Sequence, residues 1–411
     1  MTEWPTPQAR PYLLTNSIQH YAWGTTNEAA FIPKFLGRPV EPDTPYAELW
    51  IGAHPKAPSH VLADGKTIAI NEWISRFPER LLGQRVAEQF DNLPFLFKVL
   101  SAGQALSIQT HPNKKQAEIL HAKDPEHYPD DNHKPEIAIA LDHLTALVGF
   151  KTLPELQNML EDYPEISVLM GLHTSEAIDH FFNDQPDQTE SQILQLFYTS
   201  LLQKSLNAPD QLLQAINALR KRLQFEYALT EADELFLELS EIYTDADIGL
   251  FSLYAFNLVH LEKGEGVFLE AGIPHAYVKG NIVECMANSD NVVRAGLTPK
   301  FKDIQTLIDI VQYKPGKLPI FKDDFKQDAY TYQTPVPEFV VTRRSLNKGK
   351  SLKIADASMH MVLVLEGKAE LTWPDGSAVY SQGDVVFIPA CLPEYQWKAE
   401  APLMLYEVRV P

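Results

Sequence analysis

Hydrophobic and polar residues alternate in short runs through the first 150 residues, a pattern typical of β-strands. The run from 105 to 112 places Ser107, Gln109 and His111 at every second position. Side chains two residues apart project from the same face of a strand, so these three polar groups are expected to share a face. Apolar runs at residues 94–100 and 136–142 predict two further strands. The pattern therefore predicts a strand-rich region from residue 12 to about residue 150.

Helical periodicity replaces this alternation after residue 151. Thr152, followed by Pro154 and Glu155, predicts a capped helix start. Further helices are predicted by apolar spacing at residues 191–206, 207–225, 231–243 and 303–313, and by composition at 113–123. Strand character returns at residues 253–296 and again from about 325 to the end. We therefore expect a mainly β chain interrupted by a helical insertion.

Three dipeptides that separate β-prone runs predict tight turns. They are Asp64-Gly65, Glu366-Gly367 and Asp375-Gly376. A glycine in such a pair accepts the positive φ that a two-residue hairpin turn requires. Each dipeptide is therefore expected to join two antiparallel strands.

One sequence pattern occurs twice in the chain. GEGVFLEAGIPH, residues 264–275, aligns without a gap on GDVVFIPACLPE, residues 383–394. Each copy is typical of a turn, a strand and a second turn, which predicts two related small β-barrels. The last position is His275 in the first copy and Glu394 in the second. Because the imidazole is the expected metal ligand, we predict chemistry in the first barrel only.

The composition excludes some classes of protein. Of 411 residues, 54 are acidic and 35 basic, so the formal net charge is −19. A nucleic-acid-binding protein needs a basic face for phosphates, so no nucleic-acid partner is expected. There is no glycine-rich phosphate loop, which disfavours an enzyme that uses ATP or a dinucleotide. Hydrophobic residues make up 45% of the chain, which is enough for a large core.

Targeting signals are not visible in the sequence. The N-terminus lacks the basic and apolar regions of a signal peptide, and no apolar run approaches the roughly 20 residues of a membrane span. The two cysteines, Cys285 and Cys391, suit a reducing compartment. We therefore expect a cytoplasmic protein without a membrane partner.

Four polar residues on or beside predicted strands form a candidate metal site. Gln109 and His111 share a strand face, Glu136 stands two residues after Lys134, and His275 ends the first repeat. Two imidazoles, a carboxylate and an amide oxygen suit a borderline divalent metal such as zinc. By spacing alone, each could equally be a surface or capping residue, and Glu136 could pair with Lys134.

Longer motifs resemble a known family. They are FKVLSAGQALSIQTHP, HKPEIAIAL, GIPHAY and NSDNVVRAGLTPK, with YAWG and AELWIGAHP near the N-terminus. Together, and in this order, they resemble the type I mannose-6-phosphate isomerase family of the cupin superfamily. The resemblance implies two cupin-type jelly-roll barrels plus an all-α domain. The implied divisions are 1–151 and 246–324 for a catalytic barrel, 152–245 for the helical insertion and 325–411 for a C-terminal barrel without a metal site.

The resemblance also implies roles for individual residues. It implies one Zn²⁺ per chain, held by Gln109, His111, Glu136 and His275. It implies catalytic roles for Arg294, Glu284 and Lys134. Substrate-binding positions are implied at Lys300, Tyr277, Lys98, Ser107, Trp23 and Glu48. Other histidines are expected to be structural or exposed, namely His54, His121, His127, His133 and His143.

The implied reaction interconverts D-mannose 6-phosphate and D-fructose 6-phosphate through an enediol. It needs a base near C1 and C2, positive charge beside the enediolate and a cationic subsite for the phosphate. Glu284 is the candidate base, although a metal and several cations nearby are expected to lower its pKa. Arg294 offers fixed donors to the enediolate. Candidates for the phosphate and sugar oxygens are Lys98, Lys134 and Lys300.

Two other functions share parts of this pattern. An iron-dependent cupin oxygenase typically offers more histidines than this chain, in which Gln109 takes one such position. A non-catalytic sugar-phosphate-binding regulator is expected to have lost part of the residue set, which is complete here. We therefore predict a zinc-dependent isomerase of a small phosphosugar, which feeds or drains mannose for glycolysis and GDP-mannose biosynthesis.

Overall fold

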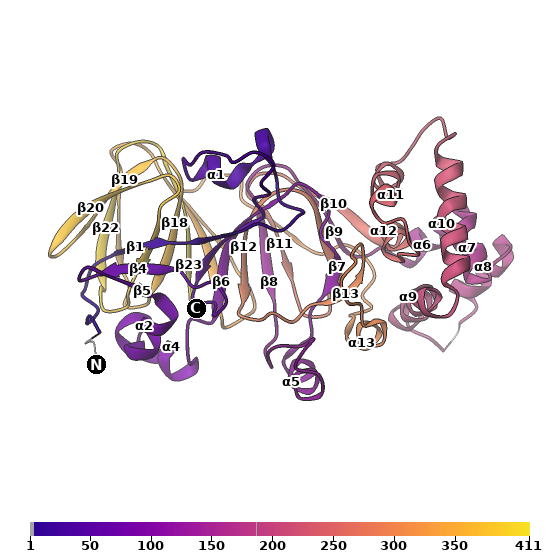
Figure 1. Cartoon of the computed structure of the whole chain (residues 1–411), viewed down its shortest axis with the longest axis horizontal. Coiled ribbons are helices and arrows are strands. Elements are labelled where there is room, and N and C mark those ends of the chain that lie inside the picture. The colour runs from indigo at the N-terminus through magenta and orange to yellow at the C-terminus, as the bar shows by residue number, and fades with distance from the viewer. Residues whose placement is uncertain (1–3, 186) are drawn as a thin grey trace.

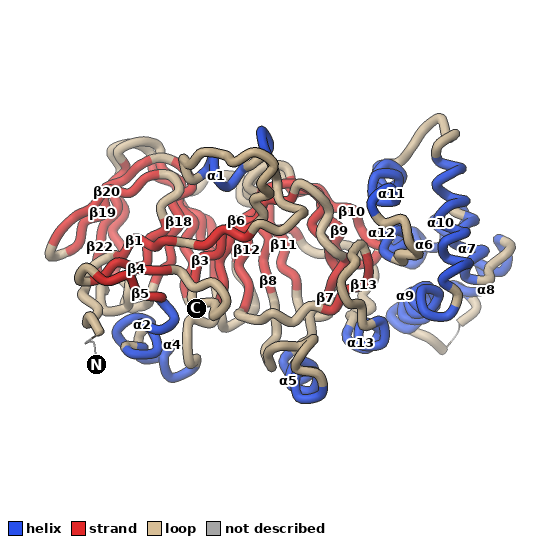
Figure 2. Tube along the Cα trace, in the orientation of Figure 1, coloured by secondary structure: helices blue, strands red, loops and turns tan. Residues whose placement is uncertain are grey.

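The strands and helices of the molecule occupy different regions. The computed structural model describes residues 4–185 and 187–411 (Figure 1). Over these residues the strands pair into three sheets, and the helices of the middle of the chain gather at one end (Figure 2). The prediction of a mainly β chain with a helical region is therefore confirmed.

The central sheet contains the candidate metal site. Its main path, from edge to edge, is β14 (Ile320–Lys322), β11 (Glu265–Leu269), β8 (Glu136–Ala140), β12 (His275–Ala287), β6 (Phe95–Ala102), β3 (Glu48–Gly52) and β2 (Ser17–Gln19). Beside this path lie β7 (Ile108–Thr110), β9 (Leu144–Phe150), β10 (Phe256–Leu261) and β13 (Val293–Gly296).

Strand β12 connects two parts of this sheet because it bends. Its first half pairs with β7 and β9, and its second half pairs with β6 and β8. Between the halves Gly280 has a φ of 129°, and a Cβ there would lie 2.5 Å from the His143 carbonyl oxygen. Only glycine fits this close approach. The bend folds the sheet over, so that His275 at the start of β12 faces Glu136 at the start of β8.

The C-terminal strands form the other two sheets. The larger has the order β15 (Ala329–Tyr332), β16 (Val340–Leu346), β23 (Leu403–Arg409), β18 (His360–Glu366), β21 (Val385–Ile388), β1 (Tyr12–Thr15), β4 (His60–Ala63) and β5 (Lys66–Ala69). The smaller has the order β17 (Ser351–Ala355), β22 (Glu394–Ala399), β19 (Lys368–Trp373) and β20 (Gly376–Ser381). Three strands from the N-terminal part of the chain, β1, β4 and β5, thus extend a C-terminal sheet.

The two closed barrels predicted from the sequence are not confirmed, because the strand order of each sheet ends in edge strands. The two copies of the repeat nevertheless take the same course. The first forms β11 and leads into β12 at His275, and the second forms β21 and leads into β22 at Glu394. His275 is buried, whereas Glu394 is exposed and pairs with Lys353 at 2.9 Å.

Two of the three predicted hairpins are confirmed. Asp64-Gly65 joins β4 to β5, and Asp375-Gly376 lies at the turn between β19 and β20. The hairpin predicted at Glu366-Gly367 is wrong, because β18 and β19 belong to different sheets. At Gly367, with a φ of 87°, the chain crosses between these sheets so closely that a Cβ would lie 1.9 Å from the Pro402 carbonyl oxygen.

The helices begin close to the predicted positions. Thr152 and Glu155 form a capping box at α6, and Asn113 and Gln116 form another at α5. The helices of the helical region are α6 (Leu153–Asp162), α7 (Pro164–Met170), α8 (Ser175–Asn183), α9 (Glu190–Asn207), α10 (Pro209–Leu223), α11 (Glu231–Ile242) and α12 (Gly249–Ala255). The others are η1 (Asn27–Ala29), α1 (Phe31–Phe35), α2 (Ile70–Arg76), α3 (Pro78–Leu82), α4 (Gln84–Gln89), α5 (Lys114–Lys123) and α13 (Ile304–Ile310).

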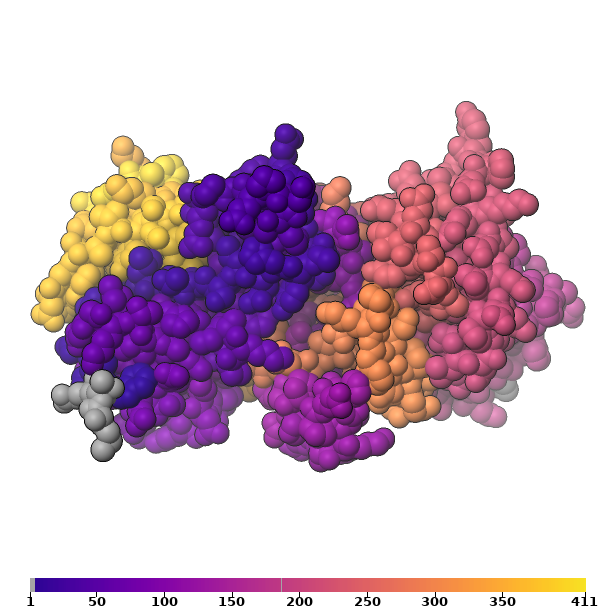
Figure 3. Space-filling view, in the orientation of Figure 1, coloured from indigo at the N-terminus to yellow at the C-terminus, as the bar shows by residue number. Residues whose placement is uncertain are grey.

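The helical region packs on the central sheet through a continuous apolar core. Leu194, Phe197 and Leu201 of α9 lie in the same cluster as Phe150 of β9 and Val293 of β13. Burial of these apolar side chains stabilises the contact between the helical region and the central sheet. Figure 3 shows the segment near residue 300, in orange, lying against the helical region. Among the described residues, no helix is both long and apolar enough to cross a membrane.

Candidate metal centre and cavity

Three of the predicted metal ligands converge inside the central sheet. His111 follows β7, while Glu136 and His275 begin β8 and β12. His275 Nε2 lies 3.0 Å from Glu136 Oε1, and His111 Nε2 lies 3.5 Å from Glu136 Oε2. All three side chains are buried, and their ligand atoms lie within 4.8 Å of one another. One metal ion can bridge atoms at this spacing after small rotations of the side chains.

Hydrogen bonds orient the two imidazoles for metal binding. His111 Nδ1 lies 2.8 Å from the Asn291 carbonyl oxygen, and His275 Nδ1 lies 3.0 Å from that of Ile273. A carbonyl only accepts, so each Nδ1 carries the proton and each Nε2 directs its lone pair at the centre. Among the described residues, the buried His111 Nε2 and Glu136 Oε2 have no hydrogen-bond partner. Buried polar atoms rarely lack partners, so this donor set fits a divalent metal such as zinc.

Gln109 lies between these three residues and the solvent. Its side-chain amide is 3.5 Å from His275 Nε2. It is half-buried and contributes to the wall of the neighbouring cavity. A 180° turn of the amide places its oxygen at the same point, so Gln109 fits as a fourth ligand.

The electrostatics keep the ligands in the protonation states that metals require. Burial, followed by the charge of Lys134, lowers the pKa of His111 to about 4, so its imidazole is neutral. Burial raises the pKa of Glu136, but the charge of Lys134, together with the two neighbouring imidazoles, outweighs it and brings this pKa well below its ordinary value. A neutral imidazole and an ionised carboxylate are the metal-binding forms.

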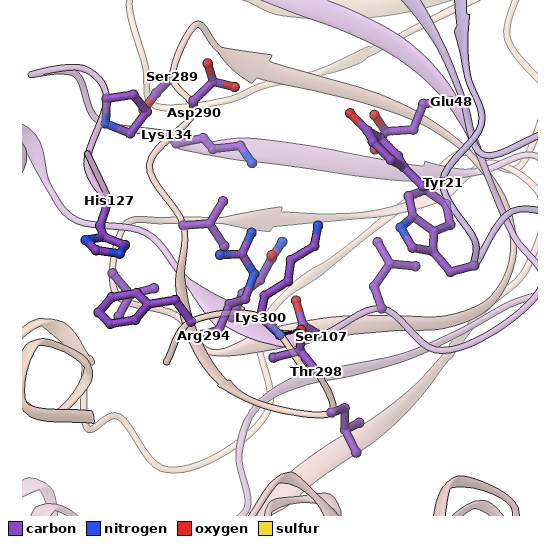
Figure 4. Close-up of a pocket in the computed structure, with 18 of the residues that line it drawn as sticks. Tyr21, Glu48, Ser107, His127, Lys134, Ser289, Asp290, Arg294, Thr298 and Lys300 are labelled. Atoms are coloured by element: carbon purple, nitrogen blue, oxygen red, sulfur yellow. Dashed lines mark hydrogen bonds between the residues drawn. The ribbon is translucent and has the colours of Figure 1, made fainter. Parts of the chain in front are cut away.

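A cavity of about 870 Å³ opens beside this centre (Figure 4). The predicted site residues that line it are Trp23, Glu48, Lys98, Ser107, Gln109, Lys134, Arg294 and Lys300. Tyr277 and Glu284 do not line it and lie buried beneath its wall. Tyr277 donates a hydrogen bond from its hydroxyl to Glu136 Oε1 at 3.1 Å, and Glu284 pairs with Lys98.

One side of the cavity is cationic. Figure 4 shows Arg294, Lys300 and Ser107 close together, with the Lys134 ammonium directed toward the same space. Within the described part of the chain, Arg294 and Lys300 make no ion pair with an acidic side chain. Burial lowers the pKa of Arg294, and burial followed by the charge of Arg294 lowers that of Lys300. Two cations without acidic partners favour an anionic ligand on this side.

On the other side of the cavity, one lysine lies between two carboxylates. Lys98 Nζ lies 2.8 Å from Glu284 Oε2 and 3.6 Å from Glu48 Oε1. Burial lowers the pKa of Lys98, but the charges of Glu284 and Glu48 outweigh it and raise this pKa. Trp50 also donates a hydrogen bond to Glu48. Lys98 is therefore a paired cation, unlike Arg294 and Lys300.

The environment of Glu284 differs from the sequence-based expectation. A low pKa is predicted for it because cations surround it. In the structure, burial raises the pKa of Glu284 in spite of the Lys98 ammonium. Desolvation of the carboxylate therefore outweighs the ion pair.

Several cavity residues are absent from the predicted set. Asp290 lies 2.9 Å from Lys56 Nζ and 3.5 Å from His54 Nε2, and all three line the cavity. Burial raises the pKa of Asp290, but these two partners outweigh it and lower this pKa. His127 is exposed, as expected, and it also stacks on Phe301 at the cavity edge, with 3.9 Å between ring centroids. Asp290 stands within the NSDNVVRAG motif, which is the signal that points to it.

These features define a class of protein. It is a mainly β protein with a buried His–Glu–His metal centre beside a cavity suited to an anion.

Comparisons with known proteins identify the family. Residues 12–153 match the family described as phosphomannose isomerase type I, catalytic domain. Mannose-6-phosphate isomerase 2 of Arabidopsis thaliana is 40% identical over 391 residues, which cover 91% of this chain and 87% of the relative. Human mannose-6-phosphate isomerase is 37% identical over 408 residues, covering 93% and 94%. The chain therefore belongs to the type I mannose-6-phosphate isomerase family of enzymes.

Solved structures agree with this assignment. A variant of phosphomannose isomerase from Salmonella typhimurium superposes with a TM-score of 0.84 at 33% identity, covering 97% of this chain and 99% of the other. A zinc-bound mannose 6-phosphate isomerase superposes with a TM-score of 0.83 at 32% identity and the same coverage.

Proposed function

We propose that this chain is a zinc-dependent aldose–ketose isomerase that interconverts D-mannose 6-phosphate and D-fructose 6-phosphate. One observation carries the proposal: a buried centre in which two ligand atoms lack a hydrogen bond adjoins a cavity in which two cations form no ion pair with an acidic side chain of the described residues. The names of the relatives support the substrate, and the zinc-bound neighbour supports the metal.

The proposed metal ligands are Gln109, His111, Glu136 and His275. When bound, the ion would supply a Lewis acid that can polarise an oxygen of the sugar. The sugar phosphate binds toward Lys300 and Ser107, where the cavity is cationic. The reacting carbons then lie between Arg294 and Lys134, and the acidic side of the cavity repels the phosphate from Glu48.

The proposed chemistry moves one proton between neighbouring carbons. A base takes the proton from C2 of the open-chain aldose, the electron pair forms the C1=C2 double bond, and the C1 oxygen gains a proton. Protonation of C1 and loss of the proton from the C2 oxygen complete the ketose. Arg294 stabilises the negative charge that develops on the oxygens, through fixed donors.

Glu284 is the proposed base, acting together with Lys98. The raised pKa of Glu284 makes it a stronger proton acceptor than an ordinary carboxylate. Glu284 lies beneath the cavity wall, 2.8 Å from Lys98, which lines the cavity, so proton transfer from C2 requires the carboxylate to turn toward the substrate.

The proposed architecture keeps the predicted divisions. Residues 1–151 and 246–324 contribute a cupin-type catalytic unit, 152–245 the helical insertion and 325–411 a C-terminal cupin-like unit without a metal site. The common course of the two repeats supports this relation, as does the exposed Glu394 at the position of His275.

The test is formation of fructose 6-phosphate from mannose 6-phosphate by the purified protein, together with metal analysis. We expect turnover that a chelator abolishes and added zinc restores. Stoichiometric metal without any turnover would contradict the proposal and favour a sugar-phosphate-binding regulator or an oxygenase.

A further inference from the structure

The segment that carries Lys300 leaves β13 through a strained turn. Leu297 is buried and has a φ of 54°, a left-handed conformation that is uncommon for a residue with a branched side chain. Gly296 precedes it, and a Cβ there would lie 2.4 Å from the Gly249 backbone nitrogen. The turn therefore packs directly against the start of α12 in the helical region.

A single buried carboxylate holds this turn. Asp247, only 4% exposed, precedes α12. Its Oδ1 accepts hydrogen bonds from the backbone N–H of Leu297 at 2.9 Å and of Gly249 at 2.8 Å. Its Oδ2 accepts from the N–H of Thr298 at 3.4 Å and from Lys302 Nζ at 3.1 Å. Asp247 thus binds both ends of the segment from 297 to 302.

The contacts continue from this carboxylate to the cavity. The Thr298 hydroxyl accepts a hydrogen bond from the Lys300 backbone N–H at 3.1 Å. Leu297, Thr298 and Lys300 all line the cavity. The direction of the Lys300 side chain therefore depends on the turn that Asp247 stabilises.

We propose that Asp247 is a positioning residue for the phosphosugar, acting through the segment 297–302 to aim Lys300 into the cavity. The inference rests on the proposed function and adds a role for the helical region in substrate binding. Arg294 does not depend on Asp247 in the same way, because it is held in β13 by pairing with β7. Loss of Asp247 should therefore weaken substrate binding more than it slows the chemical step.

The experiment compares Asp247→Asn and Asp247→Ala with a matched control, Asp233→Asn. Asp233 is also 4% exposed and belongs to the same region, but it accepts hydrogen bonds from the hydroxyls of Tyr163 and Tyr254. It makes no hydrogen bond or ion pair with the segment 297–302. The Asn variant at position 247 keeps the shape of the side chain while it removes the charge opposite Lys302.

We expect KM for mannose 6-phosphate to rise about tenfold in Asp247→Ala, with kcat changed by less than about threefold, since a displaced binding group mainly affects affinity. Asp247→Asn should give a smaller rise in KM, and Asp233→Asn should lower Tm without raising KM. In a Lys300→Ala background, Asp247→Asn should change KM by less than about twofold, because the two residues act as one unit. Equal KM effects at positions 233 and 247, or effects that add to that of Lys300→Ala, would overturn the proposal.

Hydrogen exchange separates this proposal from the isomerase proposal. The amides of Leu297 and Thr298 should exchange faster in both Asp247 variants, while those of β8 keep their protection. This readout does not require turnover, so it tests the anchoring even if the wild-type protein fails to isomerise mannose 6-phosphate. Unchanged exchange at 297 and 298 would overturn the role of Asp247.

Discussion

His275 illustrates how a single side chain combines position and protonation state. Its Nδ1 donates to the Ile273 carbonyl oxygen two residues earlier, so its Nε2 is unprotonated and lies 3.0 Å from Glu136 Oε1. The same arrangement holds for His111 and the Asn291 carbonyl oxygen. Two backbone carbonyl groups therefore fix the orientation of the imidazoles that metal binding requires.

Replacement of His275 by alanine should remove metal and activity together. Three remaining ligands bind zinc far more weakly than four, and the substitution also leaves Glu136 without its nearest partner. The measurement is metal content after dialysis, followed by the isomerase assay with and without added zinc. Full metal content and full turnover in His275→Ala would show that this residue is not a ligand.

Replacement of Arg294 by alanine should separate catalysis from metal binding. Arg294 makes no hydrogen bond or ion pair to His111, Glu136 or His275 among the described residues, so metal content should remain normal. The loss of a donor to the developing enediolate should reduce kcat by about 10²-fold or more. The check is kcat and KM for mannose 6-phosphate in metal-loaded Arg294→Ala. A rise in KM with unchanged kcat would instead make Arg294 a binding residue.

At the scale of elements, the sequence predicted the features that depend only on residues close together in the chain, such as helix starts and strand faces. Thr152 predicted a helix start because a capping side chain and its partner are only three residues apart. The period of two predicted that Ser107 and Gln109 share a face, and both line the cavity. The repeat predicted that His275 and Glu394 occupy corresponding strand starts.

Features that depend on contacts between residues far apart in the chain could not be predicted from the sequence. The Glu366-Gly367 dipeptide has the composition of a hairpin, but contact with Pro402 directs the chain to another sheet. The addition of β1 to β21 joins residues at opposite ends of the chain. Asp247 has no local motif, and its role emerges only where Leu297 folds back onto it.

The candidate site shows the same difference between what local motifs predict and what distant contacts determine. The motifs predicted Gln109, His111, Glu136 and His275 as a set, and the structure brings the four together. Sequence alone did not predict the raised pKa of Glu284, because burial of a carboxylate depends on the packing of the whole sheet.

At the scale of the whole molecule, the charge distribution reconciles an acidic chain with an anionic substrate. The net charge of −19 would repel a sugar phosphate if it were spread evenly. Arg294 and Lys300, which form no ion pair with an acidic side chain in the part of the chain that the structure describes, instead lie on one wall of the cavity. The proposed substrate therefore meets a positive local potential at this wall, although the protein as a whole is acidic.

The C-terminal sheet contains a buried charge cluster with no place in the proposed reaction. His360 of β18 lies 3.3 Å from Glu407 of β23 through Nδ1, and 3.5 Å from Asp356 through Nε2. Arg344 of β16 donates to the same Glu407 carboxylate through Nε and Nη2 at 3.1 and 3.0 Å. Because β16, β23 and β18 are neighbours in the sheet, this cluster links three strands, and β18 in turn pairs with β21, which pairs with the N-terminal strand β1.

The cluster should make stability depend on pH in two directions. Burial lowers the pKa of His360, but the contacts with the Asp356 and Glu407 carboxylates outweigh it and raise this pKa above 6.5. Its contribution is therefore complete below about pH 6.5, the unfolded pKa of histidine, and is lost as pH rises through the folded value. Burial raises the pKa of Glu407, but His360 and Arg344 lower it to about 2. That contribution is complete above the ordinary value of 4.5 and is lost as pH falls toward 2.

The variant His360→Asn isolates the basic limb of this dependence, because asparagine keeps a donor toward Glu407 but does not titrate. We expect the wild type to exceed His360→Asn in Tm by more at pH 6 than at pH 9, as measured by thermal unfolding at fixed ionic strength. His143→Asn is the control, since His143 is exposed and its ion-pair partner Glu262 is exposed as well. A Tm difference for His360→Asn that stays constant from pH 6 to pH 9 would mean that His360 is neutral in the folded protein, and that Arg344 alone balances the buried Glu407 carboxylate.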